Sequence, residues 1–304
     1  MPFGVKVRVL SAAQNKLIKL ENQPTPEKKS ALRVVIHSFF VVPLIIAVFA
    51  VLIYLVVRIM TSEPNTAQDY LEDVKIGGTT KRWQGAFELS KILSNPKQVP
   101  SDDRFVAELI STFKYATNDR DIRVKQYLAL AMGATKDMRY TQPLIEALDR
   151  PEPELIMAIA HALGNIAHKS ALAPLTELLN HGEAKVRLQA VISLGKIGDV
   201  STIPALKEMM ADPEANVRWD AAIALAKQKD ASGQRILLDL MDRNYLDSFP
   251  NIDEIEQVQA MMVAIQVAPF IQDLELKRSL EKLRDSDSNL KIREAARIAL
   301  TQFK

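Results

Sequence analysis

The chain has 304 residues with 39 Lys and Arg against 37 Asp and Glu, and this near-neutral total hides an uneven distribution. Residues 1–33 carry seven basic and two acidic side chains, residues 34–57 carry neither kind, and the rest of the chain has a net charge of −3. A slightly acidic main domain argues against nucleic-acid binding, which usually depends on a basic excess on one face. The absence of cysteine excludes a disulfide framework, a thiolate nucleophile and a thiolate metal site.

One segment is long and apolar enough to cross a membrane. The nineteen residues from Phe39 to Val57 include no Lys, Arg, Asp or Glu. As a helix they span roughly 28 Å, close to the thickness of the hydrocarbon core of a bilayer. A cleaved signal peptide has a shorter apolar region and a small-residue cleavage site, and a core helix alternates apolar and polar faces. The sequence therefore predicts a transmembrane helix within residues 34–58.

The flanking charges predict its orientation. Basic residues are retained on the cytoplasmic side, and seven of them precede the segment, whereas only Arg58 and Lys75 follow it closely. We therefore expect a basic cytoplasmic tail over residues 1–33, a polar stalk over 59–78, and a domain over 79–304 on the other side. In a bacterium this is a single-pass inner-membrane protein with a periplasmic C-terminal domain. The tail either lies on the anionic leaflet or contacts a partner, or it only sets the topology.

The rest of the chain repeats with a period of about 31 residues, and several independent columns agree on this step. The columns contain small residues (Gly133, Gly164, Gly195 and Ala226), turn residues (Asp137, His168, Asp199 and Asp230) and prolines (Pro143, Pro174 and Pro204). Each unit is typical of a helix, a short capped turn, and a second helix that begins with proline. Such a hairpin cannot bury its apolar faces alone, so we expect the units to stack into an all-α solenoid.

The stretch Val-Arg-Leu-Gln-Ala-Val-Ile-Ser-Leu-Gly-Lys-Ile-Gly-Asp, residues 186–199, resembles the HEAT repeat, and more narrowly the short HEAT-like repeats first associated with phycobilisome lyases. The match is strong over about 121–243, with degenerate units on either side. The resemblance implies an α-solenoid of about six helix pairs and a closing helix. It also implies a structural ladder that ties adjacent repeats together, formed by Asp199, Asp230, Arg187 and Arg218.

An insertion interrupts the register near residues 242–257. Insertions on a solenoid gather along one edge and are often contact sites, although they are also tolerated as plain surface loops. Exposed aromatic side chains make good anchors at interfaces. The candidate partner-binding residues in this insertion are Tyr245, Phe249, Asp247 and Asp253.

The sequence offers little sign of catalysis or cofactor binding. His161 and His168 are seven residues apart, but the register places His161 in an inward apolar column and His168 in a capping position. Two histidines without a carboxylate partner make a weak metal site. The chain lacks the His-Glu dipeptides by which HEAT-type hydroxylases bind iron. Gly77 to Lys81 lacks the spacing of a phosphate-binding loop. We expect no catalytic residue, metal or cofactor.

These observations favour a non-catalytic scaffold. A membrane anchor would hold a solenoid whose concave side binds a protein partner, as an accessory subunit of an envelope membrane complex. We expect the second helix of each pair to line the concave side, near residues 144–148, 175–179 and 206–210. The alternative is an enzyme that resembles a bilin lyase and acts on a protein-bound chromophore. Fold similarity alone does not establish that activity.

Overall fold

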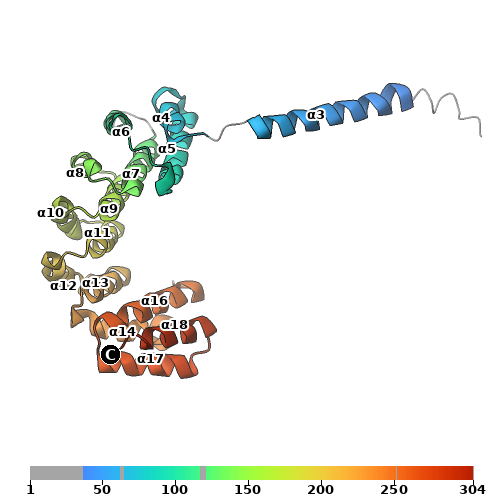
Figure 1. Ribbon diagram of the computed structural model, residues 1–304. Coiled ribbons are helices and arrows are strands. Elements are labelled where there is room, and N and C mark those ends of the chain that lie inside the picture. The colour runs from blue at the N-terminus through green and yellow to red at the C-terminus, as the bar shows by residue number, and fades with distance from the viewer. Residues whose placement is uncertain (1–36, 62–64, 117–120, 251, 304) are drawn as a thin grey trace, which may run out of the picture. The chain divides into compact units, whose positions relative to one another are not determined.

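The computed structural model describes residues 37–61, 65–116, 121–250 and 252–303, and the chain divides into two compact units, Met1–Pro64 and Asn65–Lys304. All regular secondary structure in the described residues is helical. The predicted basic tail, 1–33, lies outside the described residues. Figure 1 shows the helices of both units.

The described part of the first unit is a continuous apolar helix. A short π-helical turn, His37–Val41, leads into α3, Val42–Thr61. Pro43 lies where the π-helical turn passes into α3, and it has no N–H to donate to the preceding turn. Every side chain from Phe39 to Val57 is exposed. Among the described residues, this is the one helix long and apolar enough to cross a membrane.

The second unit consists of two rows of helices. The first row contains α5 (Thr79–Ile92), α7 (Ile122–Thr135), α9 (Pro153–Ile166), α11 (Ala184–Ile197), α13 (Ala215–Lys227), α16 (Glu254–Val267) and α18 (Leu290–Leu300). The second row contains α6 (Asp103–Tyr115), α8 (Thr141–Ile145), α10 (Leu172–Glu177), α12 (Ile203–Met209), α14 (Gln234–Leu240) and α17 (Leu274–Ser286). This arrangement is an all-helical repeat solenoid, as the sequence predicts.

Residues 59–78 differ from the predicted stalk. They contain α4, Ala67–Ile76, which packs against α5. Ala67, Leu71 and Val74 recur at helical spacing and are buried, so α4 covers the apolar end of the first repeat. Thr66 caps this helix by accepting a hydrogen bond from the backbone N–H of Asp69.

Small residues bring the first-row helices close together. A Cβ atom added to Gly133 would lie 2.4 Å from the Cα of Ala162, and one added to Gly164 would lie 2.8 Å from the Cα of Ser193. Gly195 meets Ala224 in the same way. Such contacts leave room for a hydrogen atom and no more, so these glycines set the spacing of the row.

The concave side is lined by the first helices and not by the second. Consecutive first helices from α5 to α13 lie against each other along their length, whereas the second helices from α6 to α14 barely contact one another. A row with closer spacing lies on the inside of a bend, and Figure 1 shows the first helices there. Leu144, Leu175 and Leu206, near which we expected the concave surface, are fully buried between the two rows.

The turns follow the capping pattern predicted from the repeat. The turn residue of each unit accepts a hydrogen bond from the backbone N–H two residues ahead, and this group comprises Asp137, His168, Asp199 and Asp230. The first helices of three units end in a left-handed residue, at Lys136, Ala167 and Gly198. His168 acts through Nδ1, so it replaces a carboxylate as a helix cap.

Candidate functional site

An apolar stripe runs along the concave side. On each first helix, two positions lie opposite the core-facing residues and recur with the repeat. They are Gln126 and Leu130 on α7, Met157 and His161 on α9, Leu188 and Ile192 on α11, and Trp219 and Ile223 on α13. Six of these eight side chains are apolar. Those on α7, α9 and α11 are half-buried, so they form a continuous surface that remains open to a partner.

Polar contacts between repeats border this stripe. Lys185 Nζ lies 2.6 Å from Glu154 Oε1, and Lys196 Nζ donates to Asn165 Oδ1 at 2.9 Å. Each pair joins residues 31 positions apart and so links the same position of two neighbouring units. His161 lies within the stripe, and its pKa is lowered by burial first and then by the positive charge of Lys196. The imidazole is therefore neutral at pH 7.

The insertion between α14 and α16 closes one end of the stripe with an aromatic cluster. Its short helix α15, Arg243–Asp247, carries Tyr245, and Phe249 follows. The ring centroid of Phe249 lies 5.1 Å from that of Trp219 and 5.1 Å from that of Tyr245. Trp219 Nε1 donates a hydrogen bond to the Tyr245 hydroxyl at 3.1 Å. Edge-to-face packing of this kind fixes the insertion against α13.

The predicted partner-binding residues all make contacts within the insertion or with its neighbours. Tyr245 and Phe249 are half-buried against Trp219 instead of projecting freely. Asp253 caps α16 by accepting from the backbone N–H of Glu256, and Asp247 accepts from Gln257 Nε2. All four residues therefore help to hold the insertion in place, and their binding of a partner stays a prediction.

A cleft of about 280 Å³ lies between α13 and α16, next to the aromatic cluster. Its walls are largely apolar and include Trp219, Ile223, Ile252 and Val263. Asp220 and Glu256 also line it. No hydrogen bond or ion pair reaches the Asp220 carboxylate from any residue the structure describes. Burial raises the pKa of Asp220 to about 6, and the nearby charge of Lys227 offsets only part of this effect.

The predicted ladder residues lie at the joints between repeats. Arg187 forms a bidentate pair with Asp212, with Nε–Oδ2 and Nη2–Oδ1 distances of 2.7 and 3.0 Å. Its Nη1 also donates to the carbonyls of His181 and Gly182, and Arg218 donates to the carbonyls of Asp212 and Pro213. Each arginine therefore holds the turn before its own helix, and Arg187 also reaches the next turn.

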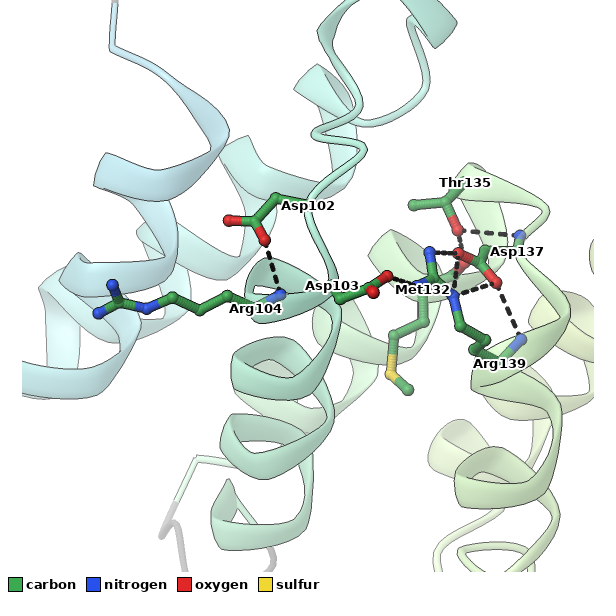
Figure 2. A network of polar contacts seen from close by, with 7 residues as sticks. All are labelled: Asp102, Asp103, Arg104, Met132, Thr135, Asp137 and Arg139. Atoms are coloured by element: carbon green, nitrogen blue, oxygen red, sulfur yellow. Dashed lines mark hydrogen bonds and ion pairs between the residues drawn. The ribbon is translucent and has the colours of Figure 1, made fainter.

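The two ladder aspartates also accept bonds from the preceding repeat. Lys169 Nζ lies 3.5 Å from Asp199, and Lys207 Nζ lies 2.9 Å from Asp230. Figure 2 shows a joint near the start of the solenoid that is built differently: Arg139 pairs with Asp137 of its own turn and with Asp103 of the preceding unit. These contacts place the acidic turn column at the boundary between one unit and the next.

Two acceptors at these joints escaped the sequence analysis. The Asp212 side chain is only 3% exposed and holds the pair with Arg187. The Asp287 side chain, also 3% exposed, forms the same bidentate pair with Arg243 at 3.0 and 2.7 Å. Burial acts to raise the pKa of Asp287, but the hydrogen bonds from Arg243 and from the backbone of Asn289 lower it further than burial raises it.

The described residues contain no group of three or more His, Asp or Glu side chains arranged to hold a metal ion. His161 lies on a helix and His168 in a turn, as the repeat register predicts. The apolar stripe and the cleft between α13 and α16 lie next to each other on the concave side and share Trp219 and Ile223.

Comparison with known proteins supports the repeat assignment. Two overlapping stretches, residues 110–185 and 172–247, match the model of the HEAT-repeat family. The matched residues lie at the centre of the solenoid. No curated protein matches the sequence of the chain.

Solved structures show the same architecture. The complex of CpcE and CpcF of phycocyanin lyase from Nostoc sp. PCC7120 is similar with a TM-score of 0.56 and 16% identity, over 79% of this chain and 88% of that chain. The Escherichia coli protein YibA is similar with a TM-score of 0.50 and 19% identity, over 77% of this chain and 81% of that chain. At such identities the likeness shows the fold alone.

Proposed function

We propose that this protein is a membrane-anchored, non-catalytic scaffold that binds a protein partner on the concave side of its solenoid. The observation that carries this proposal is the stripe of half-buried apolar side chains from Leu130 on α7 to Ile192 on α11. Contiguous apolar surface on a soluble domain usually marks an interaction site. A helix of the partner would bury this stripe with its own apolar face.

The apolar helix α3 supports the anchoring part of the proposal. Its side chains from Phe39 to Val57 are exposed along their whole length, and the hydrocarbon core of a bilayer is an apolar environment that would cover them. Anchoring beside a membrane complex raises the effective concentration of the solenoid at its partner. We therefore propose an accessory subunit of an envelope membrane complex.

Recovery of the full-length protein in mild detergent tests this function. We expect a membrane protein to co-purify at near-equal stoichiometry and to be identified by mass spectrometry. Ile192→Glu should release this protein, because burying a carboxylate in the stripe without an opposite charge or a hydrogen-bond donor costs free energy. Val200→Glu is the matched control, since Val200 is 67% exposed in the turn before α12 and its substitution should leave recovery unchanged.

The thermal unfolding midpoints of both variants show whether loss of the partner reflects loss of the fold. Ile192→Ala, a milder change, serves if Ile192→Glu unfolds. Recovery of the partner with all three variants at the wild-type level would contradict a concave binding site.

The likeness to a phycocyanin lyase complex favours one second candidate, an enzyme that acts on a protein-bound chromophore. Its test is the visible absorption of the protein purified from its own cells. A pigment bound at equal stoichiometry, together with the absence of a protein partner, would contradict the scaffold function and support the enzyme.

A further inference from the structure

One wall of the cleft between α13 and α16 belongs to an acidic segment of the chain. Residues 244–276 contain no lysine or arginine and six acidic residues: Asp247, Asp253, Glu254, Glu256, Asp273 and Glu275. Four of them, from Asp247 to Glu256, are exposed on the insertion and on the first turn of α16. The cleft lies between this segment and α13, which carries Lys227 near Asp220, and the acidic wall attracts cations.

The shape of the cleft suits a side chain better than a cofactor. Its volume of about 280 Å³ falls at or below the lower end of the roughly 300–1,000 Å³ typical of small-molecule pockets. Trp219 and Ile223 are each 7% exposed and form one wall, and Ile252 and Val263 lie opposite on the insertion and α16. An apolar chain with a charged tip would fill such a space.

Asp220 supplies the charge that such a tip would meet. Asp220 lines the cleft, and its carboxylate receives no hydrogen bond or ion pair from the described residues, although half-burial removes much of its contact with water. With a pKa of about 6 it is still largely ionised at pH 7. An ionised carboxylate in this position costs free energy, and a cation that entered the cleft would remove that cost.

We propose that this cleft binds an apolar segment of the partner protein that carries one arginine or lysine, with its cation between Asp220 and Glu256. The inference rests on the proposed function and names the chemistry of the partner at one end of the concave stripe. The aliphatic stem of either residue would pack on Trp219 and Ile223. Arginine would also gain from stacking on the indole ring.

Other occupants fit the cleft poorly. Nucleic acid, phosphate and anionic lipid headgroups would all bring negative charge against two carboxylates. A purely apolar segment would bury Asp220 further without pairing it, and an acidic segment would do the same while adding repulsion. The insertion therefore acts as one wall of the binding site, with Tyr245 and Phe249 holding that wall in place.

Site-specific photocrosslinking in the full-length protein, in its own membranes, tests this proposal. The photoreactive residue p-benzoylphenylalanine replaces Gln259, which is exposed on the rim of the cleft, and in a control protein it replaces Val200. We expect a crosslink from position 259, but not from position 200, to a partner segment with a lysine or arginine among apolar residues. Mass spectrometry identifies the sequence of the crosslinked peptide and so shows whether it carries a lysine or arginine.

A charge-neutralising variant completes the test. Asp220→Asn keeps the shape of the side chain, and we expect it to lower the yield of the crosslink at position 259 by roughly tenfold or more. Glu208→Gln, an equivalent change on the exposed face of α12, should leave the yield unchanged. Because Asp220→Asn removes an unpaired carboxylate, it should bind less while folding at least as well, which separates binding from structure.

The outcomes distinguish the two proposals. Suppose that the partner is recovered through the apolar stripe but gives no crosslink at position 259, or gives a crosslink whose yield Asp220→Asn does not change. Either result would contradict binding in the cleft and would leave the proposed scaffold function unaffected. A crosslink to lipid, nucleic acid or an acidic segment would overturn it equally. A protein that recovers no partner at all would overturn both.

Discussion

At the scale of single residues, Asp220 makes the folded state less stable at neutral pH. Its pKa rises from an ordinary value of 3.8 to about 6 because of burial, so between these values the folded protein holds a proton that the unfolded chain releases. Stability therefore falls as the pH rises through this range, and the cost is fully present above about 6.

We expect Asp220→Asn to raise the free energy of unfolding by about 1–2 kcal/mol at pH 7.5 and by almost nothing near pH 4. Urea unfolding at both pH values measures this, and an equal gain at both would show that the carboxylate is not the cause.

The ion pair between Arg187 and Asp212 stabilises the folded state at neutral pH, unlike the unpaired Asp220. The hydrogen bonds from Arg187 are the largest influence on the pKa of Asp212 and lower it, so the stabilisation is present above the ordinary value near 3.8 and is lost as the pH falls below it. Asp212→Ala leaves Arg187, whose side chain is 13% exposed, without its partner. We expect a loss of about 3 kcal/mol in the free energy of unfolding at pH 7.

Arg297→Ala is the control for this prediction. Arg297 and Glu294 form an ion pair in which both side chains are more than half exposed. Solvent screens such a pair, so its loss should change stability by less than about 0.5 kcal/mol. Similar losses from the two variants, measured by the same chemical unfolding, would contradict a special role for the buried pair.

At the scale of helices, the glycines of the first row should tolerate no side chain. A Cβ atom at Gly164 would lie 2.8 Å from the Cα of Ser193, so α9 and α11 would have to move apart. We expect Gly164→Ala to cost about 1–3 kcal/mol, the range found for overpacked interiors. Gly182→Ala adds the same methyl group where no atom lies within 4 Å and should change stability by less than about 0.5 kcal/mol. Thermal unfolding of the two variants compares them directly.

The helical register could be predicted from the sequence because each repeated position has a local cause. A turn residue that caps the next segment acts through its own backbone neighbours, so even His168 could be assigned from its place in the column. The row that lines the concave side has no such local cause. It depends on the spacing between helices, which follows from pairs such as Gly133 and Ala162 that contact each other across repeats.

The acceptors for the arginines escaped prediction for a related reason. The position 31 residues before Asp212 is His181, which caps its own turn through Nδ1 but forms no bidentate pair. The positions that precede Arg187 at the same step are Ile156 and Lys125. The repeat therefore predicts that Asp212 caps its turn. It does not predict the ion pair between Arg187 and Asp212, because the equivalent positions of the preceding repeats have no such pair. The cleft could not be predicted from the repeat either, because the insertion that forms one of its walls has no equivalent in the other repeats.

At the scale of the whole molecule, the uneven charge on either side of α3 predicts its orientation. The seven basic residues before residue 34 should stay in the cytoplasm, and the solenoid should cross the membrane. We expect alkaline phosphatase, which is active only outside the cytoplasm, to be active when fused after Lys304. A green fluorescent reporter that folds only in the cytoplasm, fused at the same point, should stay dark. The reverse pattern would invert the topology.

The small-residue contacts of the first row also make the repeats exchangeable. Gly133 meets Ala162, and Gly164 meets Ser193, in nearly the same geometry. Deletion of residues 153–183, one full period, would place Gly133 against Ser193 and rebuild a contact of the same kind. The solenoid can therefore gain or lose length only in whole repeats. Duplication of one unit would lengthen the concave stripe by a fixed increment without a new interface having to evolve.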